Sequence, residues 1–326
     1  MLTTEQFKQR LHSLVDLEDG FGALVYFAIK GDEGVILKKA NIQGDVLTRI
    51  AKGYRESLLA ELQRFEQDAQ MAVVNLSDRD ERANVIYRFD IPDTEPSYFS
   101  IMREPLEQPD TVFTGNKMFN FDRDTFSDID YFVIELGAEC NKVVVYRDNF
   151  NVNLLKRGPG RIFLSKSGTQ ITTVDNDVLR MDSQIDCLLL DSDFYIINLK
   201  NLDTCKEFAD LIRVRATQAL GRIAELPYID NVEGLRDRIQ VELSFARRLM
   251  RAMDNSPITR LPPDTILDFV RNHHTLHRVL RINGDKFVLM SKRSQNALIS
   301  LLNDDFLYSK LTQRDYETLA KGPVVE

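Results

Sequence analysis

The sequence predicts a mixed α/β protein, with a mostly antiparallel sheet and helices in its N-terminal and central parts and a largely helical C-terminal part. Short apolar runs separated by Gly, Asn and Asp turns occupy residues 131–200, whereas apolar residues recur at helical spacing from residue 203 onward. The chain has 326 residues, 43% of them hydrophobic, which is enough for more than one core. We therefore expect an N-terminal α/β region (1–128), a central β-rich region (129–202) and a C-terminal helical region (203–326).

The first region opens with a helix, a hairpin and a second helix. Residues 3–17 predict an amphipathic helix with Thr3 or Thr4 as its N-cap. The apolar runs 22–30 and 34–39 flank a short polar turn and predict a β-hairpin. Apolar residues recur mainly at steps of four over 44–68, which predicts a long helix whose apolar stripe packs on the sheet.

Two further strands are expected at 71–76 and 84–89, followed by an irregular stretch over residues 90–128. Prolines interrupt that stretch at positions 92, 96, 105 and 109. Because proline breaks both helices and sheet ladders, we expect a loop-rich linker or insertion without long regular elements.

The remaining elements are predicted from the spacing of apolar residues, which changes from strand-like to helical near residue 203. Six short apolar runs predict an antiparallel meander: 131–136, 142–147, 161–165, 170–174, 187–190 and 194–200. Beyond them the pattern predicts helices at 203–226, 232–253, 262–276, 292–302 and 313–320, with one short strand at 286–290.

Charge is distributed unevenly along the chain. The formal net charge is −8, but residues 1–200 hold 23 Lys and Arg against 33 Asp and Glu, whereas residues 201–326 hold 19 against 17. Most cations of the second part are arginines, which suit bidentate contact with phosphate or carboxylate. The two parts of the chain are therefore expected to meet different surroundings.

Several classes of protein are not indicated. The three cysteines form no close pair, so neither a disulfide framework nor a zinc site is expected, and this composition fits a reducing, cytoplasmic compartment. The N-terminus lacks the apolar stretch of a signal peptide, and no window approaches the length of about 20 apolar residues that spans a bilayer. A P-loop, a nucleophile elbow and a dinucleotide fingerprint are missing, so we expect neither an enzyme nor a cofactor.

The most unusual segment is Leu155–Gly168, which reads LKRGPGRIFLSKSG. Its four cations surround Gly-Pro-Gly with no acid among them: Lys156, Arg157, Arg161 and Lys166. Glycine backbone amides and cations together can hold a phosphate of a nucleic acid or a nucleotide. A solvated hairpin turn explains the pattern equally well.

Basic groups also recur in the helical part. Arg247, Arg248 and Arg251 form the densest of them and are expected to help bind phosphate, although a solvated helix face is the simpler explanation for each group. His273 and His277, four residues apart, would share one helix face, but no third metal ligand follows from the sequence. We expect no metal at these histidines.

A metal-dependent nuclease is an alternative interpretation of the hairpin 186–200. Such enzymes place an acid on one strand and an acid-x-Lys on the next, which would use Asp186, Asp191 and Lys200 here. The acid expected two residues before Lys200 is Asn198, so the site lacks a carboxylate that Mg²⁺ needs. The alternative is therefore a degenerate or unusual nuclease.

The block NFNVNLLKRGPGRIFLSKSGTQITTVDNDVLRMDSQIDCLLLDSDFYIINLK, residues 149–200, resembles the characteristic region of the KwaB family of the Kiwa anti-phage defence system. The shared pattern consists of an asparagine-rich lead, a basic Gly turn, Ile-Phe-Leu-Ser, a Val-Leu-Arg strand and a paired hairpin. The likeness extends over most of the chain in length and order, but these features are not catalytic motifs.

The resemblance implies a cytoplasmic protein that works beside a small membrane-spanning partner, KwaA, at the inner face of the membrane, and that acts on phage DNA by binding it. A net charge of −8 repels DNA at long range, so contact is expected at a basic patch or in a groove between two copies. A homodimer is expected because two-fold assembly is the commonest kind. The rival interpretation is a scaffold that only docks on the membrane partner.

Overall fold

The computed structural model describes two compact units. The described residues are 2–17, 20–31, 34–78, 84–91, 95–108, 112–138, 141–150, 154–155, 164–167, 170–174, 177–254, 256, 258–309 and 314–317. One unit consists of Met1–Val73 with Ser97–Asn201, and the other of Val74–Pro96 with Leu202–Glu326. The division of the chain into three regions stays a prediction.

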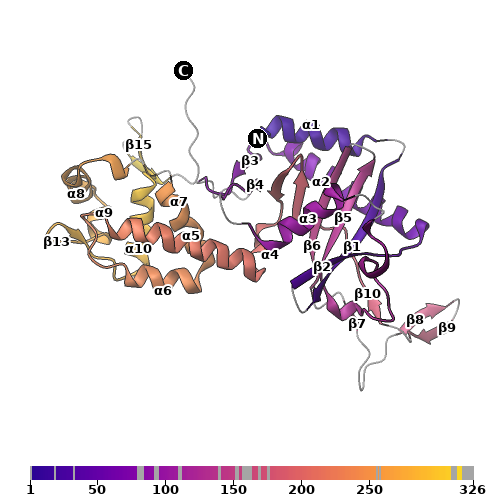
Figure 1. Cartoon of the computed structure of the whole chain (residues 1–326). Helices are drawn as coiled ribbons and strands as arrows, with labels where there is room; N and C mark the ends of the chain where they lie inside the picture. The colour runs from indigo at the N-terminus through magenta and orange to yellow at the C-terminus, as the bar shows by residue number, and fades with distance from the viewer. Residues whose placement is uncertain are drawn as a thin grey trace. The chain divides into compact units, whose positions relative to one another are not determined.

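An antiparallel sheet forms the centre of the first unit (Figure 1). Its strands are hydrogen-bonded in the order β2-β1-β5-β6-β11-β12, and each of these neighbouring pairs is antiparallel. The strands are β1 (Gly22–Gly31), β2 (Gly34–Lys39), β5 (Ile129–Ala138), β6 (Asn141–Asp148), β11 (Cys187–Leu190) and β12 (Asp193–Ile196). The predicted mixed α/β class and the antiparallel pairing of these central strands are confirmed.

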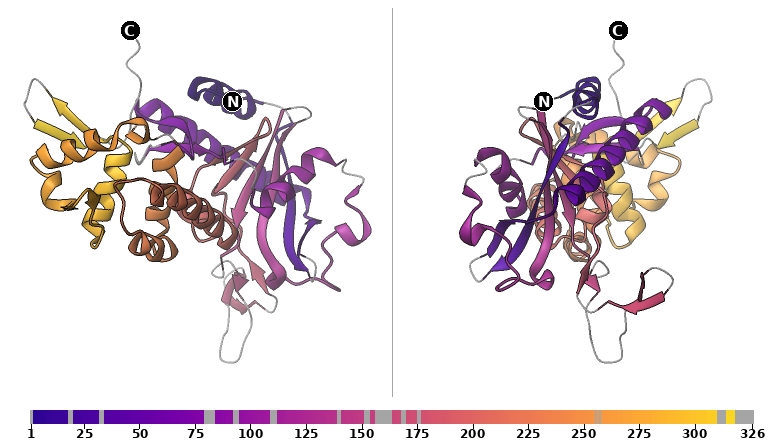
Figure 2. Two further views of the ribbon diagram at one scale, coloured as in Figure 1. Left: turned by 60° about the vertical axis from the view of Figure 1, so that its left-hand side comes forward. Right: turned by 90° about the vertical axis from the view of Figure 1, so that its right-hand side faces the viewer.

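Helices cover both faces of this sheet. Because side chains alternate along a strand, Phe194 and Tyr195 of β12 point to opposite faces. Phe99 of α3 (Ser97–Glu107) stacks on Phe194 at 3.8 Å between ring centroids, whereas Phe7 of α1 (Thr4–Val15) packs on Tyr195 at 4.6 Å. Helix α2 (Gly44–Gln67) packs beside α1 and against β1, so α1 and α2 share one face and α3 covers the other (Figure 2).

Local sequence accounts for the start of this unit. Thr3 caps α1 through a capping box with Gln6, as predicted for this position. Helix α2 buries a stripe at the predicted spacing, including Tyr54, Leu58 and Leu62. Gly137 has a φ of +112°, and a Cβ there would lie 2.1 Å from the carbonyl oxygen of Asn141, so the turn between β5 and β6 requires glycine.

The prediction of a loop-rich stretch over residues 90–128 is wrong at its centre, where α3 forms. Pro105 lies inside this helix and cannot donate a backbone hydrogen bond. The helix nevertheless buries Tyr98, Phe99 and Met102 against the sheet, and this apolar burial outweighs the missing bond. The rest of the stretch includes short 3-10 turns at Gly115–Lys117 and Phe126–Asp128.

Short strand pairs lie at one end of the first unit. Strand β7 (Leu154–Leu155) pairs with β10 (Val178–Leu179), and β8 (Leu164–Ser167) pairs with β9 (Gln170–Thr173). The unit ends in a single helical turn, α4 (Leu199–Leu202), where a strand end was predicted.

The second unit is mainly helical, as predicted for the C-terminal part. Its helices are α5 (Lys206–Ala224), α6 (Glu233–Val241), α7 (Leu243–Asp254), α8 (Pro263–Asn272), α9 (Leu276–Val279) and α10 (Lys292–Leu302). Its short strands are β4 (Val85–Arg88), β13 (Ile282–Asn283), β14 (Lys286–Phe287), β15 (Phe306–Ser309) and β16 (Arg314–Glu317), and β3 (Ala72–Asn75) runs across the boundary between the units. Helix α5 packs against α6 and α7 around a core that includes Phe208, Ile212 and Leu249.

Three predictions for this unit are wrong in detail. The single helix expected over 232–253 is two helices, because Glu242 leaves the helical conformation with φ −126° and ψ 90°. Its carboxylate instead receives two hydrogen bonds from Arg238. The strand expected at 286–290 is one half of a two-residue hairpin, and the helix expected at 313–320 contains β16, which pairs with β15.

Candidate functional site

The basic segment predicted at 155–168 begins at β7, which pairs with β10. Leu154 and Leu155 of β7 face Leu179 and Val178 of β10. Lys156, Arg157 and Arg161 lie outside the described residues, and Lys166 belongs to β8, of which only the backbone is described. The base of the turn is therefore placed, while the phosphate contacts of its cations stay a prediction.

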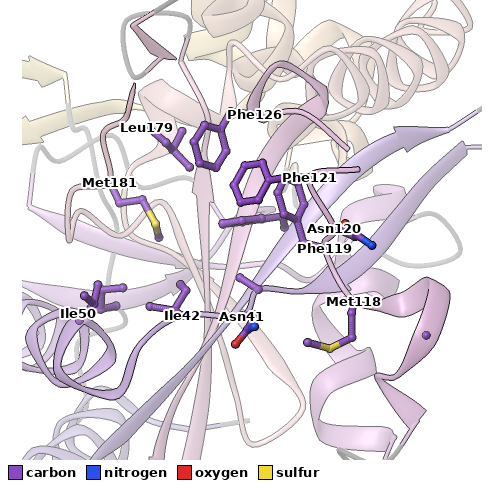
Figure 3. Close-up of a pocket in the computed structure, with 14 residues that line it drawn as sticks. Asn41, Ile42, Ile50, Met118, Phe119, Asn120, Phe121, Phe126, Leu179 and Met181 are labelled. Atoms are coloured by element: carbon purple, nitrogen blue, oxygen red, sulfur yellow. The ribbon is translucent and has the colours of Figure 1, made fainter. Parts of the chain in front are cut away.

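A pocket of about 780 Å³ lies beside the base of this turn (Figure 3). It is formed by β1, the start of α2, the loop that carries the two 3-10 turns, and the segment that contains β10. Of the described residues that line it, none is charged, and the side chains labelled in Figure 3 are mostly aliphatic or aromatic. This volume falls in the range of about 300–1,000 Å³ that is typical of ligand sites.

Three phenylalanines form the aromatic wall of the pocket. Phe119 packs on Phe27 of β1 at 5.0 Å, which ties the loop to the sheet. Phe121 stands edge to face on both Phe119 and Phe126, with ring centroids 5.1 Å apart in each case. Phe121 is 69% exposed, whereas Phe119 is buried, so the wall begins in the core and ends at the surface.

The loop that forms part of the pocket also carries charged side chains that do not line it. Lys38 forms an ion pair with the buried carboxylate of Asp124 and thereby holds the loop after Phe121 against β2. Hydrogen bonds from Lys38 and from the Asn120 backbone outweigh the effect of burial and lower the pKa of Asp124. Arg123 is exposed and donates a hydrogen bond of 2.6 Å to the neutral Asn116 side chain. Together these contacts hold an apolar hollow that has a cationic side chain at its edge.

A buried ionic network fixes the sheet on the same face. Arg147 of β6 donates two hydrogen bonds of 2.9 Å to Asp182 and further bonds of 3.0 and 3.2 Å to Asp186. Asp186 is fully buried and also accepts from the Asp148 backbone at 3.0 Å and from Asn201 at 2.7 Å. The network thus links β6, the start of β11, α4 and the segment that follows β10.

The network perturbs the titration of its members. Burial lowers the pKa of Arg147, but the hydrogen bonds and charges of Asp182 and Asp186 outweigh burial and raise it. Asp182 is also desolvated, yet its bonds from Arg147 and Gln184 lower its pKa. Burial, with the nearby charge of Asp186, raises the pKa of Asp148 to about 6. Asp148 therefore takes up a proton at a higher pH than an ordinary aspartate does.

The residues of the nuclease interpretation are not gathered at one place. Asp186 precedes β11 and is bound by Arg147, whereas Asp191 follows β11 and pairs with Arg10 at 2.8 Å. The four residues of β11 lie between them, which places their Cα atoms about 16 Å apart along an extended strand. Lys200 is exposed in α4. In the part of the chain that the structure describes, no group of three His, Cys, Asp or Glu side chains is arranged to hold a metal ion.

The predicted arginines of α7 differ in their surroundings. Arg247 forms an ion pair with Asp203 and is 14% exposed in its side chain. Arg251 is 4% exposed, donates to the Leu76 carbonyl at 2.7 Å and lies over the Tyr87 ring at 5.1 Å. Arg248 is half-buried. Arg247 and Arg251 thus have contacts inside the second unit, and their role toward DNA stays a prediction.

The histidines do not share a helix face. Helix α8 ends at Asn272, so His273 has an extended backbone and its Nδ1 lies 3.3 Å from the Thr275 and Leu276 backbone nitrogens. His277 lies in the separate turn α9, with its Nδ1 2.8 Å from the His273 carbonyl. The prediction that His273 and His277 share a helix face is wrong, because α8 ends at Asn272, directly before His273.

The pocket was not predicted from the sequence. Its aromatic wall lies in the stretch interpreted as a linker, and its other residues come from β1, α2 and β10, which only the fold brings together. Three phenylalanines within eight residues of a polar loop, Phe119, Phe121 and Phe126, were the available signal, because loops rarely carry so much apolar surface without a partner.

No helix in the described part of the chain combines the length and the apolar character needed to cross a membrane.

Comparison with known proteins gives a consistent result. The family model described as "Kiwa protein KwaB-like" matches residues 126–312, more than half of the chain. The Kiwa protein KwaB of Escherichia coli O55:H7 (strain RM12579 / EPEC) is 28% identical over 330 aligned positions that cover 100% of both chains. No solved structure matches the chain. The family match includes the basic turn, both strands of the β11–β12 hairpin and helices α5 to α10.

Proposed function

Because this chain belongs to the Kiwa protein KwaB-like family, we propose that it serves Kiwa anti-phage defence by binding phage DNA without reading its sequence. On this proposal the protein blocks the use of the DNA rather than cutting it, and it works beside the membrane partner KwaA of the same system. The cytoplasmic location and the recruitment to the membrane through KwaA are parts of the proposal.

The observation that carries the proposal is the basic turn. Lys156, Arg157, Arg161 and Lys166 lie within fourteen residues that contain no acid, in a chain whose net charge is −8. Such a local excess of cations attracts phosphate when the rest of the molecule repels it. The turn begins directly after β7, which is anchored by β10, so its base is held on the first unit.

Two features of the charge distribution shape the proposal. The overall acidity restricts DNA contact to a patch or to a groove completed by a second copy, which is why we propose a homodimer. Arg247 and Arg251 already have partners inside the second unit, so the turn carries most of the proposed contact and α7 adds to it.

The test is a binding titration of the full chain with labelled duplex DNA across a salt series, with Mg²⁺ present and the DNA checked for cleavage afterwards. We expect intact DNA and an affinity that falls linearly on logarithmic axes. The variant Arg157→Glu with Arg161→Glu should bind more weakly and reduce the slope by roughly 2, at about 0.9 per phosphate contact.

A matched control separates the turn from net charge. Arg236 and Arg260 are exposed in the second unit, and Arg236→Glu with Arg260→Glu changes the net charge by the same amount. If both double variants lose affinity equally, the turn is not the contact. If the wild-type chain fails to bind DNA even at low salt, the DNA-binding proposal is wrong. Cleavage that is lost in Asp191→Ala would instead establish the nuclease interpretation.

A second candidate function is a scaffold that docks on KwaA without touching DNA. It is favoured by Val241 and Met290 of the second unit, which are 85% and 90% exposed. Met290 lines a cavity of about 740 Å³ together with Asp230, Glu233 and Asp237, a surface that repels DNA and suits a cationic apolar segment. Salt-insensitive binding to KwaA by a chain that shows no DNA affinity would establish the scaffold.

A further inference from the structure

Phe121 is an exposed aromatic ring that the fold holds in place. Its 69% exposure leaves most of its surface in water, and its two edge-to-face neighbours, Phe119 and Phe126, fix it at the mouth of the pocket. Large apolar groups held out of the core in this way are typical of binding surfaces. Folding alone does not account for the position of this ring.

The pocket behind Phe121 has the size and character of a site for a flat aromatic group. Its volume of about 780 Å³ exceeds that of one nucleobase several times over, and its walls are apolar (Figure 3). Met118 and Met181 supply adaptable thioether surface. Asn41 is exposed at the edge, and its amide offers both a donor and an acceptor to a polar ring edge.

Positive charge lies next to this apolar surface. Arg123 is two residues from Phe121, and its guanidinium reaches Asn116, the neighbour of the lining residue Gly115. An apolar protein segment would not need this cation, whereas a nucleic acid strand needs both a cation and an aromatic platform.

The geometry points to a specific ligand: the pocket takes an unpaired base of a DNA strand, which stacks on Phe121 while an adjoining phosphate meets Arg123. This inference rests on the proposed DNA-binding function and names the form of DNA that the site prefers. Bases of an intact duplex are stacked on their neighbours and cannot reach a ring in a pocket without unstacking. Single strands, and duplexes with unpaired ends, therefore bind more tightly than blunt duplex.

The absence of tryptophan from the chain makes a direct test possible. In the variant Phe121→Trp all tryptophan emission comes from the pocket mouth, and a base stacked on the indole quenches it. We expect quenching by a 20-nucleotide oligothymidine and no quenching by a blunt duplex of the same length. Phe269→Trp in α8, where the native ring is 44% exposed, is the matched control and should stay unquenched with both.

Affinity gives the second readout. Stacking is worth about 1–3 kcal/mol per base by alanine substitution, so Phe121→Ala should weaken oligothymidine binding about 5- to 150-fold. Its affinity for blunt duplex should not change, and Phe269→Ala should change neither. Thermal unfolding of both alanine variants should match that of the wild type, because both side chains are partly exposed.

The outcomes separate this inference from the proposed function. If the chain binds both DNA forms equally and the tryptophan at position 121 stays unquenched, the inference is wrong and DNA binding stands, which leaves the pocket to an apolar segment of a partner protein. If the wild-type chain binds neither form at low salt, both the inference and the proposed function are wrong.

Discussion

Replacing Arg147 by methionine tests whether the ionic network holds the first unit together. Arg147 is 5% exposed and Asp186 is fully buried, so Arg147→Met leaves the Asp186 carboxylate without a cation in the interior. Removing one partner of a buried pair in this way costs about 3–5 kcal/mol, a large share of the roughly 5–15 kcal/mol that stabilises a domain. Methionine keeps most of the apolar stem, so the loss comes mainly from the charge.

Urea unfolding measures this loss. A tryptophan placed at position 121 reports the first unit, because the chain has no tryptophan of its own, and all variants are compared in that background. Lys52→Met is the control within the same unit: it removes an ion pair with Glu56 in which both side chains are more than 60% exposed. That variant should lose less than about 0.5 kcal/mol.

A double variant shows where the energy comes from. Arg147→Met with Asp186→Asn removes the buried negative charge as well, and it should recover part of the stability lost in the single variant. The reasoning is refuted if Arg147→Met costs no more than Lys52→Met, because the Asp186 carboxylate would then find enough stabilisation in its bonds from Asn201 and the Asp148 backbone.

Three further predictions concern pH and backbone geometry. Because burial raises the folded-state pKa of Asp148 from 3.8 to about 6, the folded chain retains a proton that the unfolded chain releases, and stability falls as the pH rises through that window. Asp148→Asn should therefore unfold at a higher temperature than the wild type at pH 7.5 and at the same temperature at about pH 3, below the unfolded-state pKa; a constant difference would contradict this. Glu242 has a pKa lowered to about 2, chiefly by its hydrogen bond from Arg238, so its contribution is present above its ordinary value of 4.5 and lost as the pH falls towards 2. Glu242→Gln should lower the unfolding temperature of the second unit at pH 7 and leave it unchanged at pH 2. Gly137→Ala should cost more than about 1 kcal/mol in urea unfolding, because its positive φ and the 2.1 Å approach to Asn141 exclude a side chain, whereas Gly44→Ala meets open space at the start of α2 and should not destabilise the chain.

Some elements could be predicted because nearby residues decide them. The capping box of α1 needs only Thr3 and Gln6, and the β1–β2 hairpin needs only two apolar runs and a short turn. The stripe of α2 follows from spacing alone. Interactions of this kind act within a few residues, so they are present in the sequence as patterns.

Other elements depend on partners that are distant in the chain. Pro105 indicated a loop, yet α3 forms because Phe99 stacks on Phe194 and Tyr98 on Tyr146. The helix expected over 232–253 breaks at Glu242, whose carboxylate also receives a hydrogen bond from Lys292, fifty residues away. Arg251 looked like a surface cation, but Leu76 and Tyr87 surround it. Tertiary contacts override local propensity at each of these places.

By itself the sequence determined the mixed α/β class, the mostly antiparallel pairing, the helical C-terminal part and the resemblance to the KwaB family. The spacing of apolar residues and the order of residues along the chain can be recognised without the three-dimensional structure. Only the tertiary structure decided that the Asp186 carboxylate binds the Arg147 guanidinium, and that Phe27, Ile50, Phe121 and Leu179 line one pocket. The physical reason is that this pocket and this buried ion pair are made by segments between 23 and 152 residues apart, and their contacts exist only after the sheet has brought those segments together.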